Sequence, residues 1–268
     1  MKIQYRSDNL VVFESALFRT TTSLIIADDH LLLIDPNWLP IELEFIRDYV
    51  QPLQKGKECF LFFTHSDYDH IIGYQTFRNW TMIASRNFVN QKNKTAIIDK
   101  IIALDDDNYV QRKYPVVYPE IDIVLEEDDT ELSLGNSTYE VTYALGHNDD
   151  SIFLLDPEHE VLIAGDYLSN IEFPYVYHSF KEYDTTLDKF KKRIDSNRIK
   201  LLVPGHGDFT TDLQDMRKRE EDARWYLQEL KRLGIDFPFK EYVTRYDFPQ
   251  VMLKFHQANL DLLKKEFG

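Results

Sequence analysis

The sequence predicts an α+β protein in which two β-sheets pack face to face with helices on their outer sides, a four-layer αββα sandwich. Two blocks of short β-rich runs, each followed by stretches of helical periodicity, favour this architecture. The chain has 268 residues, of which 43% are hydrophobic and 14% aromatic, so it can bury a sizeable core. We expect one domain over residues 1–268, with a helical extension at about 209–268.

The first block reads β-β-β-α-β. Short β-rich runs stand at Leu10 to Phe13, Ser23 to Ala27 and Leu31 to Ile34. Pro40 then opens a stretch whose apolar residues recur at the spacing of one helical face. Strand character returns at Cys59 to Phe63. The order of these runs predicts a β-meander followed by a strand–helix–strand unit.

The rest of the chain gives a second β-rich block and then helices. We predict a helix at 95–104 and an irregular stretch at 105–108. A helical face at Leu187, Phe190 and Ile194 follows a cap-like Asp184-Thr-Thr segment. The expected strands are 82–84, 121–125, 139–144, 152–155, 161–164 and 201–203, and the expected C-terminal helices are 213–233 and 249–267.

Composition narrows the class of partner. Lys and Arg number 31 against 46 Asp and Glu, and the formal charge of −15 disfavours nucleic acid and anionic membranes. No apolar run approaches the ~20 residues of a membrane span, and the polar start does not resemble a signal peptide, so we expect a cytoplasmic protein. The expected partner is a small-molecule substrate, and a homodimer is left open. The single cysteine, Cys59, is interpreted as a buried strand residue.

The densest chemical feature is the segment Phe63-Thr-His-Ser-Asp-Tyr-Asp-His70, which follows an apolar strand. His65, Asp67, Asp69 and His70 supply two imidazoles and two carboxylates within six residues. A turn after a strand can direct such side chains toward one centre, and these are ligands that zinc, iron and manganese accept. The segment therefore predicts a metal site.

Three more candidate ligands stand at the ends of apolar strands, each directly after a glycine: His147, Asp166 and His206. Glycine permits close backbone approach and unusual φ angles, which suits a side chain turned into a crowded pocket. The other histidines lack neighbouring candidate ligands and are interpreted as surface or packing residues; they are His30, His159, His178 and His256.

These motifs, taken in order, resemble the metallo-β-lactamase-fold superfamily, whose pattern is His-x-His-x-Asp-His followed by a Gly-His, a Gly-Asp and a Gly-His. Asp35, at the end of Leu32-Leu-Ile-Asp35, is similar to the family's structural aspartate near the site. The resemblance implies an αββα fold and two divalent metal ions. By position, His65, Asp67 and His147 would bind the first ion, Asp69, His70 and His206 the second, and Asp166 both.

One residue departs from the family pattern, because Asp67 stands where the second histidine is expected. Three carboxylates and a bridging hydroxide would then balance two divalent cations, which makes the centre less positive than the usual set. Such a centre favours harder ions, so iron or manganese becomes an alternative to zinc. The alternative interpretation is that Asp67 does not bind and only one ion is held firmly.

The resemblance implies a metal-dependent hydrolase in which a metal-bound hydroxide attacks an ester, thioester, lactone or phosphodiester. Asp69 is the candidate catalytic residue, as a proton carrier to the leaving group. The alternatives are an iron-dependent oxidoreductase on the same fold and, third, a non-catalytic binding protein. Residues with an equal expectation of lining the pocket or of packing are Tyr68, Asn148, Tyr167 and the segment Phe173-Pro-Tyr175.

Overall fold

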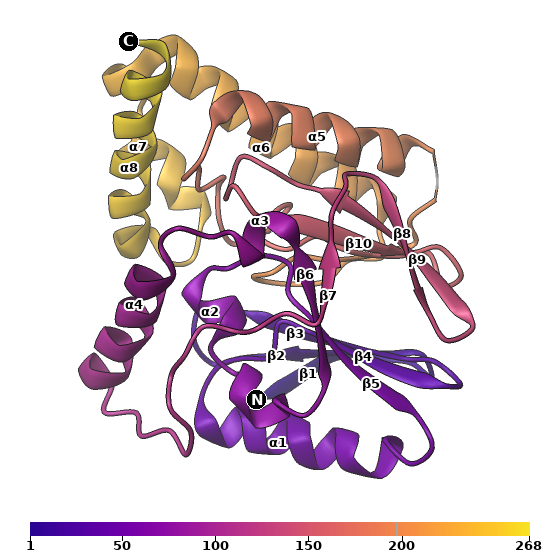
Figure 1. Ribbon diagram of the computed structural model, residues 1–268. Helices are drawn as coiled ribbons and strands as arrows, with labels where there is room; N and C mark the ends of the chain where they lie inside the picture. Colours follow the sequence, from indigo (N-terminus) through magenta and orange to yellow (C-terminus); the bar gives the residue numbers. More distant parts are fainter. Residues whose placement is uncertain (197) are drawn as a thin grey trace.

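The computed structural model describes residues 1–196 and 198–268, and it has two β-sheets packed face to face with helices outside them (Figure 1). The first sheet has the strand order β1-β2-β3-β4-β5-β6-β7, and the second has the order β12-β11-β10-β9-β8. The strands are β1 (Lys2–Arg6), β2 (Leu10–Glu14), β3 (Thr21–Ile26), β4 (His30–Ile34), β5 (Glu58–Phe62), β6 (Thr81–Ser85), β7 (Ile123–Leu125), β8 (Thr130–Leu134), β9 (Ser137–Tyr143), β10 (Ile152–Asp156), β11 (Val161–Ile163) and β12 (Leu201–Val203).

The helices cover the outer faces of both sheets, which confirms the predicted αββα sandwich (Figure 1). The α-helices are α1 (Pro40–Val50), α2 (Tyr68–Ile71), α3 (Arg86–Val89), α4 (Lys94–Asp107), α5 (Phe180–Asp195), α6 (Leu213–Leu233), α7 (Phe239–Tyr242) and α8 (Pro249–Phe267). Short 3₁₀ helices occur at Gln51–Leu53, Tyr74–Phe77, Gly234–Asp236 and Val243–Arg245. A core between the sheets includes Val12, Leu32, Val141 and Leu154, all fully or almost fully buried.

Strand direction decides where the strand ends lie. Strands β4, β5, β6 and β7 are parallel neighbours, so their carboxyl ends share one edge of the first sheet. In the second sheet β11 pairs with β12 in parallel, and β9 runs the same way because two antiparallel pairings separate it from β11. The segments that follow β4, β5, β9, β11 and β12 therefore leave the two sheets at a common end.

Most predicted elements are present, with corrections at particular boundaries. The predicted irregular stretch at 105–108 is wrong over its first three residues, because α4 continues through Asp107. Helix α5 begins at Phe180, earlier than the Asp184 segment, because the Ser179 hydroxyl accepts a hydrogen bond from the Glu182 amide at 3.3 Å. Two strands were not predicted: β1 at the N-terminus, and β8, which buries Leu132 and Leu134 on alternate positions. Cys59 lies in a strand, as expected, but is only half-buried.

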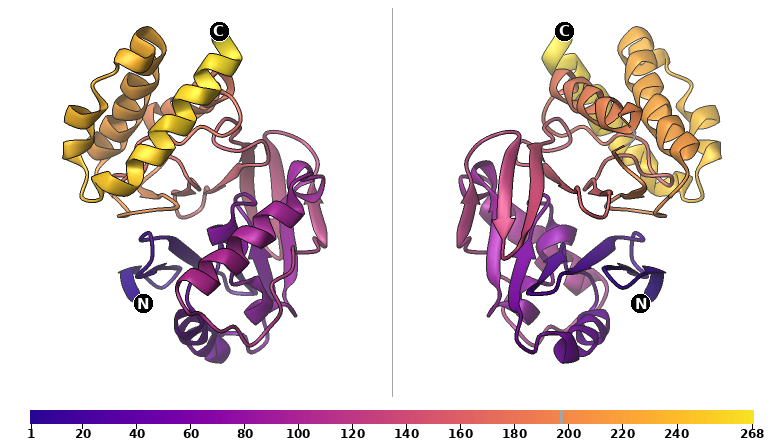
Figure 2. Two further views of the ribbon diagram at one scale, coloured as in Figure 1. Left: turned by 90° about the vertical axis from the view of Figure 1, so that its left-hand side faces the viewer. Right: turned by 90° about the vertical axis from the view of Figure 1, so that its right-hand side faces the viewer.

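Helices α5 and α6 cover the second sheet's outer face, and α7 and α8 extend the same apolar core at one end of this layer (Figure 1 and Figure 2). Tyr226 and Leu230 of α6 and Met252 of α8 are almost completely buried in this core. The helical extension predicted at about 209–268 is thus an integral part of this layer. Among the helices of the described residues, none is long and apolar enough to cross a bilayer.

Candidate metal centre

The seven predicted ligands converge at the common end of the two sheets. His65 follows β5, Asp67 is the N-cap residue of the short helix α2, and Asp69 and His70 lie on that helix. His147, Asp166 and His206 follow β9, β11 and β12. The side chains of His65, His70 and His147 are almost completely buried. Residues from distant parts of the sequence therefore face one centre.

The candidate ligands form two groups, one of His65, Asp67, His147 and Asp166 and the other of Asp69, His70 and His206, and Asp166 also lies within 3.4 Å of the His70 and His206 imidazoles. Its Oδ2 lies 3.6 Å from His65 Nε2 and 3.3 Å from His147 Nε2. Its Oδ1 lies 2.9 Å from His70 Nε2 and 3.4 Å from His206 Nε2. Each oxygen of this one carboxylate thus faces a different pair of imidazoles.

Two further carboxylates complete the groups. Asp67 Oδ2 lies 3.3 Å from His147 Nε2 and 3.8 Å from His65 Nε2. Asp69 Oδ2 lies 3.3 Å from His206 Nε2 and 3.9 Å from His70 Nε2. Two ligands of a tetrahedral ion with bonds of about 2.1 Å are about 3.4 Å apart, so most of these separations fit a shared cation.

All four imidazoles direct Nε2 toward the centre, because Nδ1 of each ring lies within hydrogen-bonding distance of an oxygen atom on the outer side. His70 Nδ1 bonds Asp35 Oδ2 at 2.9 Å, and His65 Nδ1 lies 2.9 Å from the Thr64 hydroxyl. The other two rings are held by main-chain carbonyls: His147 Nδ1 bonds the Tyr175 carbonyl at 2.7 Å and His206 Nδ1 bonds the Phe18 carbonyl at 2.9 Å. Such outer partners fix the tautomer and the ring direction of a metal-binding histidine.

Asp35 lies within reach of His65 and His70 as a possible third group, but both of its oxygens already accept hydrogen bonds, so we interpret it as a support of His70. It is almost completely buried, and it also accepts hydrogen bonds from the Thr64 amide at 2.9 Å and the Thr64 hydroxyl at 2.5 Å. Asp67 has a comparable partner, because the Asn148 amide donates to Asp67 Oδ1 at 2.8 Å. This bond leaves Oδ2 as the Asp67 atom that faces His65 and His147.

Buried atoms without hydrogen-bond partners indicate, independently of any family pattern, that these residues fit a pair of divalent cations. His65 Nε2 is a buried polar atom that has no hydrogen-bond partner within the described residues, and Asp166 Oδ1 is likewise buried with only the His70 imidazole, at 2.9 Å, beside it and no hydrogen bond of good geometry. An unpaired buried polar atom costs about 1–3 kcal/mol, so such atoms are rare unless something else binds them. Both atoms belong to the two groups described above, and a cation in each group would satisfy them.

The charges at the centre also favour the binding of a cation. Burial alone would lower the pKa of His147, but hydrogen bonds to Asp166 and Asp67 outweigh it and raise this pKa to about 10. Burial would likewise lower the pKa of His206, and the negative charge of Asp166 raises it instead to about 10. The pKa of Asp166 is held well below its usual range by the surrounding imidazoles, although burial opposes this. The site thus accumulates negative charge that attracts protons or metal cations.

Two of the glycines stand where a side chain could not. A Cβ atom on Gly205 would collide with Asp166 Oδ1. Gly146 has a φ of +122°, and a Cβ there would collide with the backbone of Tyr183. The sequence interpretation of these glycines as points of close approach is confirmed at both positions.

A cleft opens over the two groups, and aromatic side chains form much of its wall. Phe18, Tyr68, Tyr175 and Tyr177 line it together with Phe255 of α8. The Tyr175 ring stacks on the Phe255 ring at a centroid distance of 4.1 Å. Of the residues expected either to line the pocket or to pack, Tyr68 and Tyr175 line this cleft. The C-terminal helix α8 therefore forms part of the cleft wall.

Tyr167 and Phe173, which were also expected either to line the pocket or to pack, do not line this cleft. Tyr167 is buried, and its hydroxyl bonds the Ala144 carbonyl at 2.8 Å and accepts from the His147 amide at 2.9 Å, so it packs behind His147. Phe173 packs in the C-terminal core and also borders the polar pocket.

Glu172 is a residue of the cleft that the sequence did not single out. It is half-buried and lines the cleft over the candidate ligands. Burial raises the pKa of Glu172 to about 7, with a smaller contribution from the negative charge of Asp166. A carboxyl six residues after Asp166 carries no recognisable sequence signal, because only the loop's conformation brings it over the centre.

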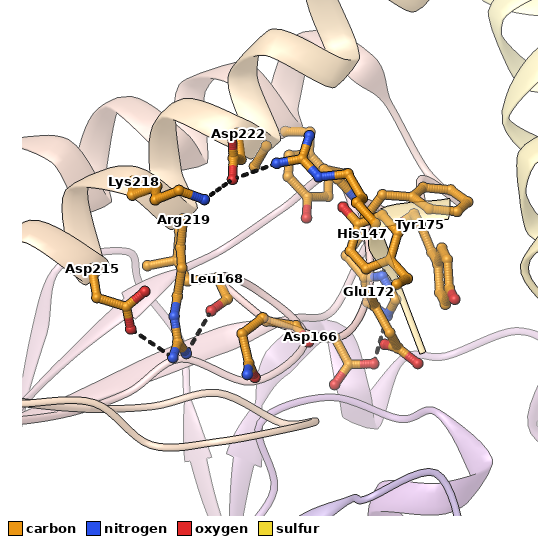
Figure 3. Close-up of a pocket in the computed structure, with 17 residues that line it drawn as sticks. His147, Asp166, Leu168, Glu172, Tyr175, Asp215, Lys218, Arg219 and Asp222 are labelled. Atoms are coloured by element: carbon orange, nitrogen blue, oxygen red, sulfur yellow. Dashed lines mark hydrogen bonds and ion pairs between the residues drawn. The ribbon is translucent and has the colours of Figure 1, made fainter. Parts of the chain in front are cut away.

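A polar pocket adjoins the cleft along helix α6 (Figure 3). His147, Asp166 and Glu172 lie at one end of it, and charged side chains of α6 lie at the other. Those charges are paired: Arg219 contacts Asp215 at 2.8 Å. Lys218 and Arg245 both contact Asp222, at 2.9 and 2.8 Å. The cations of this pocket are therefore already neutralised by carboxylates.

Helix α8 also clamps the segment that holds His147. Asn259 is completely buried, its Oδ1 accepts from the Val176 amide at 2.8 Å, and its Nδ2 donates to the Pro174 carbonyl at 2.7 Å. These bonds flank Tyr175, whose carbonyl holds His147 Nδ1. The orientation of His147 thus depends on a residue from the end of the chain.

The histidines outside the ligand set are surface or packing residues, as expected. His30 bonds Asp29 and the Tyr139 hydroxyl, each at 2.7 Å, and His159 contacts Asp156 at 2.8 Å. His178 is exposed and pairs with Glu182. His256 is buried among aromatic side chains of the C-terminal helices.

Comparison with solved structures gives the same fold at low sequence identity. A metallo-beta-lactamase family protein from Thermus thermophilus has a TM-score of 0.66 and 15% identity, covering 97% of this chain and 94% of that chain. A double mutant of the sec-alkyl sulfatase PisA1 has a TM-score of 0.65 and 15% identity. That match covers 91% of this chain but only 45% of the sulfatase, so this chain spans less than half of that enzyme's length.

A metallo-beta-lactamase from Pontibacter korlensis is also similar, with a TM-score of 0.57 and 15% identity over 83% of this chain and 98% of that chain. No curated protein matches the sequence significantly. The sequence model of the metallo-beta-lactamase superfamily matches residues 16–206, which contain all seven candidate ligands. The chain is therefore a member of the metallo-beta-lactamase superfamily.

Proposed function

We propose that this protein is a hydrolase that holds two divalent cations and cleaves neutral carboxylic esters or lactones. The observation that carries the proposal is the position of Asp166, each of whose oxygens faces a separate pair of imidazoles. His65, Asp67 and His147 would hold one cation, and Asp69, His70 and His206 the other. When bound, such cations polarise a carbonyl oxygen and lower the pKa of water toward neutrality.

The chain's own residues support the remaining steps. Asp69 lies at the floor of the cleft, where its carboxylate can accept a proton and pass it to a leaving oxygen. The Tyr175 hydroxyl is buried, lines the cleft and has no hydrogen-bond partner within the described residues. Because this hydroxyl is shielded from solvent, it would meet a substrate only after a small side-chain rearrangement, and we propose that it then donates a hydrogen bond to the substrate. Burial, with the negative charge of Glu172, raises its pKa well above the usual value, so it stays a donor.

The charges around the cleft favour a neutral substrate. No lysine or arginine is among the described residues that line the cleft. Four carboxylates line it: Asp67, Asp69, Asp166 and Glu172. Arg19, which lines the cavity next to the cleft, already pairs with Glu14 at 2.9 Å and with Asp208. The three aspartates would offset three of the four positive charges of the two cations, and beyond the cations no side chain of this cleft is free to pair with the added negative charge of a sulfate ester or a phosphodiester.

The test combines metal analysis with substrates that share one leaving group. We expect about two equivalents of a first-row transition metal per chain, and faster hydrolysis of p-nitrophenyl acetate than of p-nitrophenyl sulfate or bis(p-nitrophenyl) phosphate, by at least about tenfold. Asp166→Asn should lose both activity and metal. The matched control is Asp156→Asn, because Asp156 is also a buried carboxylate beside an imidazole. Less than a tenth of an equivalent of metal, or a preference for the anionic esters, would contradict the proposal.

The second candidate, an iron-dependent oxidoreductase, has one observation in its favour. Asp67 gives the first group a carboxylate in place of a nitrogen ligand, and oxygen-rich sets favour harder ions such as iron. Iron in the purified protein, with a visible absorption band and oxygen consumption, would support this function over hydrolysis.

A further inference from the structure

An apolar groove runs from the cleft between the N-terminal loop and the start of α8. Its cavity volume is about 500 Å³, and its apolar lining residues are Ala16, Phe18, Ile171, Phe248, Val251 and Met252. Several of these side chains are exposed to solvent: Phe248 by 53%, Phe18 by 38% and Val251 by 37%. Exposed apolar side chains gathered in one concave place usually mark a binding site.

The groove is continuous with the cleft over the candidate metal ligands. Phe18, Glu172 and Val251 line both. The cleft itself has a cavity volume of only about 40 Å³, which is room for a reacting group but not for a whole substrate. The remainder of a bound molecule must extend into the groove or into the polar pocket along α6.

These two extensions differ in chemistry. The polar pocket, of about 150 Å³, is bordered by the ion pairs of α6, and an apolar chain there would desolvate them at a cost. In the groove the same chain would cover apolar surface that water now contacts, which is favourable.

We propose that the groove holds an apolar acyl chain of the substrate, so that the protein prefers esters of medium-chain acids to acetate esters. This inference rests on the proposed function, because it places the ester group in the cleft. The carbonyl would lie over Asp67, Asp69 and Asp166, and the chain would pass Phe18 and Val251 toward Phe248.

The test is a chain-length series of p-nitrophenyl esters from acetate to hexanoate. Full burial of a methylene is worth about a fourfold gain in kcat/KM, and a half-open groove about twofold, so hexanoate should exceed acetate by about 15- to 250-fold. Ala16→Trp and Gln250→Trp each place an indole in the groove from opposite walls, and should cut the hexanoate-to-acetate ratio at least tenfold. The matched control is Leu253→Trp, which lies on α8 with its side chain 59% exposed outside this lining and should keep the ratio.

The outcomes separate this inference from the proposed function. Ester hydrolysis with a ratio near one, or with a ratio unchanged by both groove variants, overturns the chain-binding groove and leaves the hydrolase intact. If neither esters nor lactones are cleaved, the proposed function fails, and the groove is tested alone by isothermal titration of octanol into metal-free protein. Binding that Ala16→Trp abolishes supports an alkyl site. Absence of binding, as would follow if a second copy of the chain covered the groove, overturns it.

Discussion

Replacing Asp35 by asparagine should weaken metal binding although Asp35 is not in the ligand set. In the native protein Asp35 Oδ2 accepts from His70 Nδ1 at 2.9 Å, which leaves Nε2 unprotonated toward the centre. An asparagine is nearly isosteric, and its oxygen can still accept from the Thr64 amide, as Asp35 Oδ1 does at 2.9 Å. Its NH₂ group then faces His70 Nδ1 as a donor. The imidazole would have to take the other tautomer, with the proton on the nitrogen that must bind the cation.

The size of the effect follows from this change of tautomer. Loss of an outer partner of a metal-binding histidine typically costs 10- to 100-fold in metal affinity, which is about 1.4–2.7 kcal/mol. The variant also loses a charge-assisted hydrogen bond in a buried place, which should cost about 1.5–3 kcal/mol of unfolding free energy. Both losses are small enough for the protein to fold, so the metal affinity can be measured.

The assay is competition between metal-free protein and a chromophoric chelator for zinc, with unfolding followed by circular dichroism. Asp156→Asn is the matched control, because Asp156 Oδ2 bonds His159 Nδ1 at 2.8 Å in the same way but far from the candidate ligands. It should lose stability and keep its metal affinity. If Asp35→Asn binds zinc as tightly as the native protein, or if both variants lose affinity equally, the tautomer argument is wrong.

Further predictions follow from the same contacts. Asp67→His should bind zinc more tightly relative to manganese, measured by competition, and an unchanged preference would mean that Asp67 is not a ligand. Tyr175→Phe should keep its metal content and lose about 10- to 100-fold in kcat/KM for p-nitrophenyl acetate; equal activity would remove the hydroxyl from the mechanism. Burial lowers the pKa of His256 to about 4, below its unfolded value of about 6.5. Burial of the neutral imidazole therefore contributes its full stability above pH 6.5. As the pH falls from 6.5 through 4, the free energy of unfolding should decrease by about 2–3 kcal/mol. Chemical denaturation of His256→Gln should show a smaller decrease over the same range.

The sequence predicted the fold and the site best where ligand-capable residues directly follow apolar strands. Apolar strands that end in ligand-capable residues predicted both the sandwich and the convergence of His65, His147 and His206, because parallel strands deliver their ends to one edge. Asp35 was recognised only as a residue near the site. Its bond to His70 depends on the register of β4 against β5, which pairing in three dimensions decides.

The cleft wall could not be predicted in this way. Phe18, Glu172 and Phe255 reach it from a loop, a second loop and the C-terminal helix, and none has a motif. Their positions depend on how two loops and α8 pack together in three dimensions, which is a property of many small contacts. Strand β8 was missed because its alternating pattern covers only five residues with two large apolar side chains and follows an acidic run at 126–129.

The Asn259 clamp makes helix α8 and the metal centre thermodynamically linked. If docking of α8 orders the Tyr175 carbonyl, and that carbonyl orders His147, then cation binding must in turn strengthen the docking of α8 by the same free energy. Loading the protein with metal should therefore slow amide hydrogen exchange in the last helix, whose residues are not ligands. A chain that has lost its cations would release its C-terminus first.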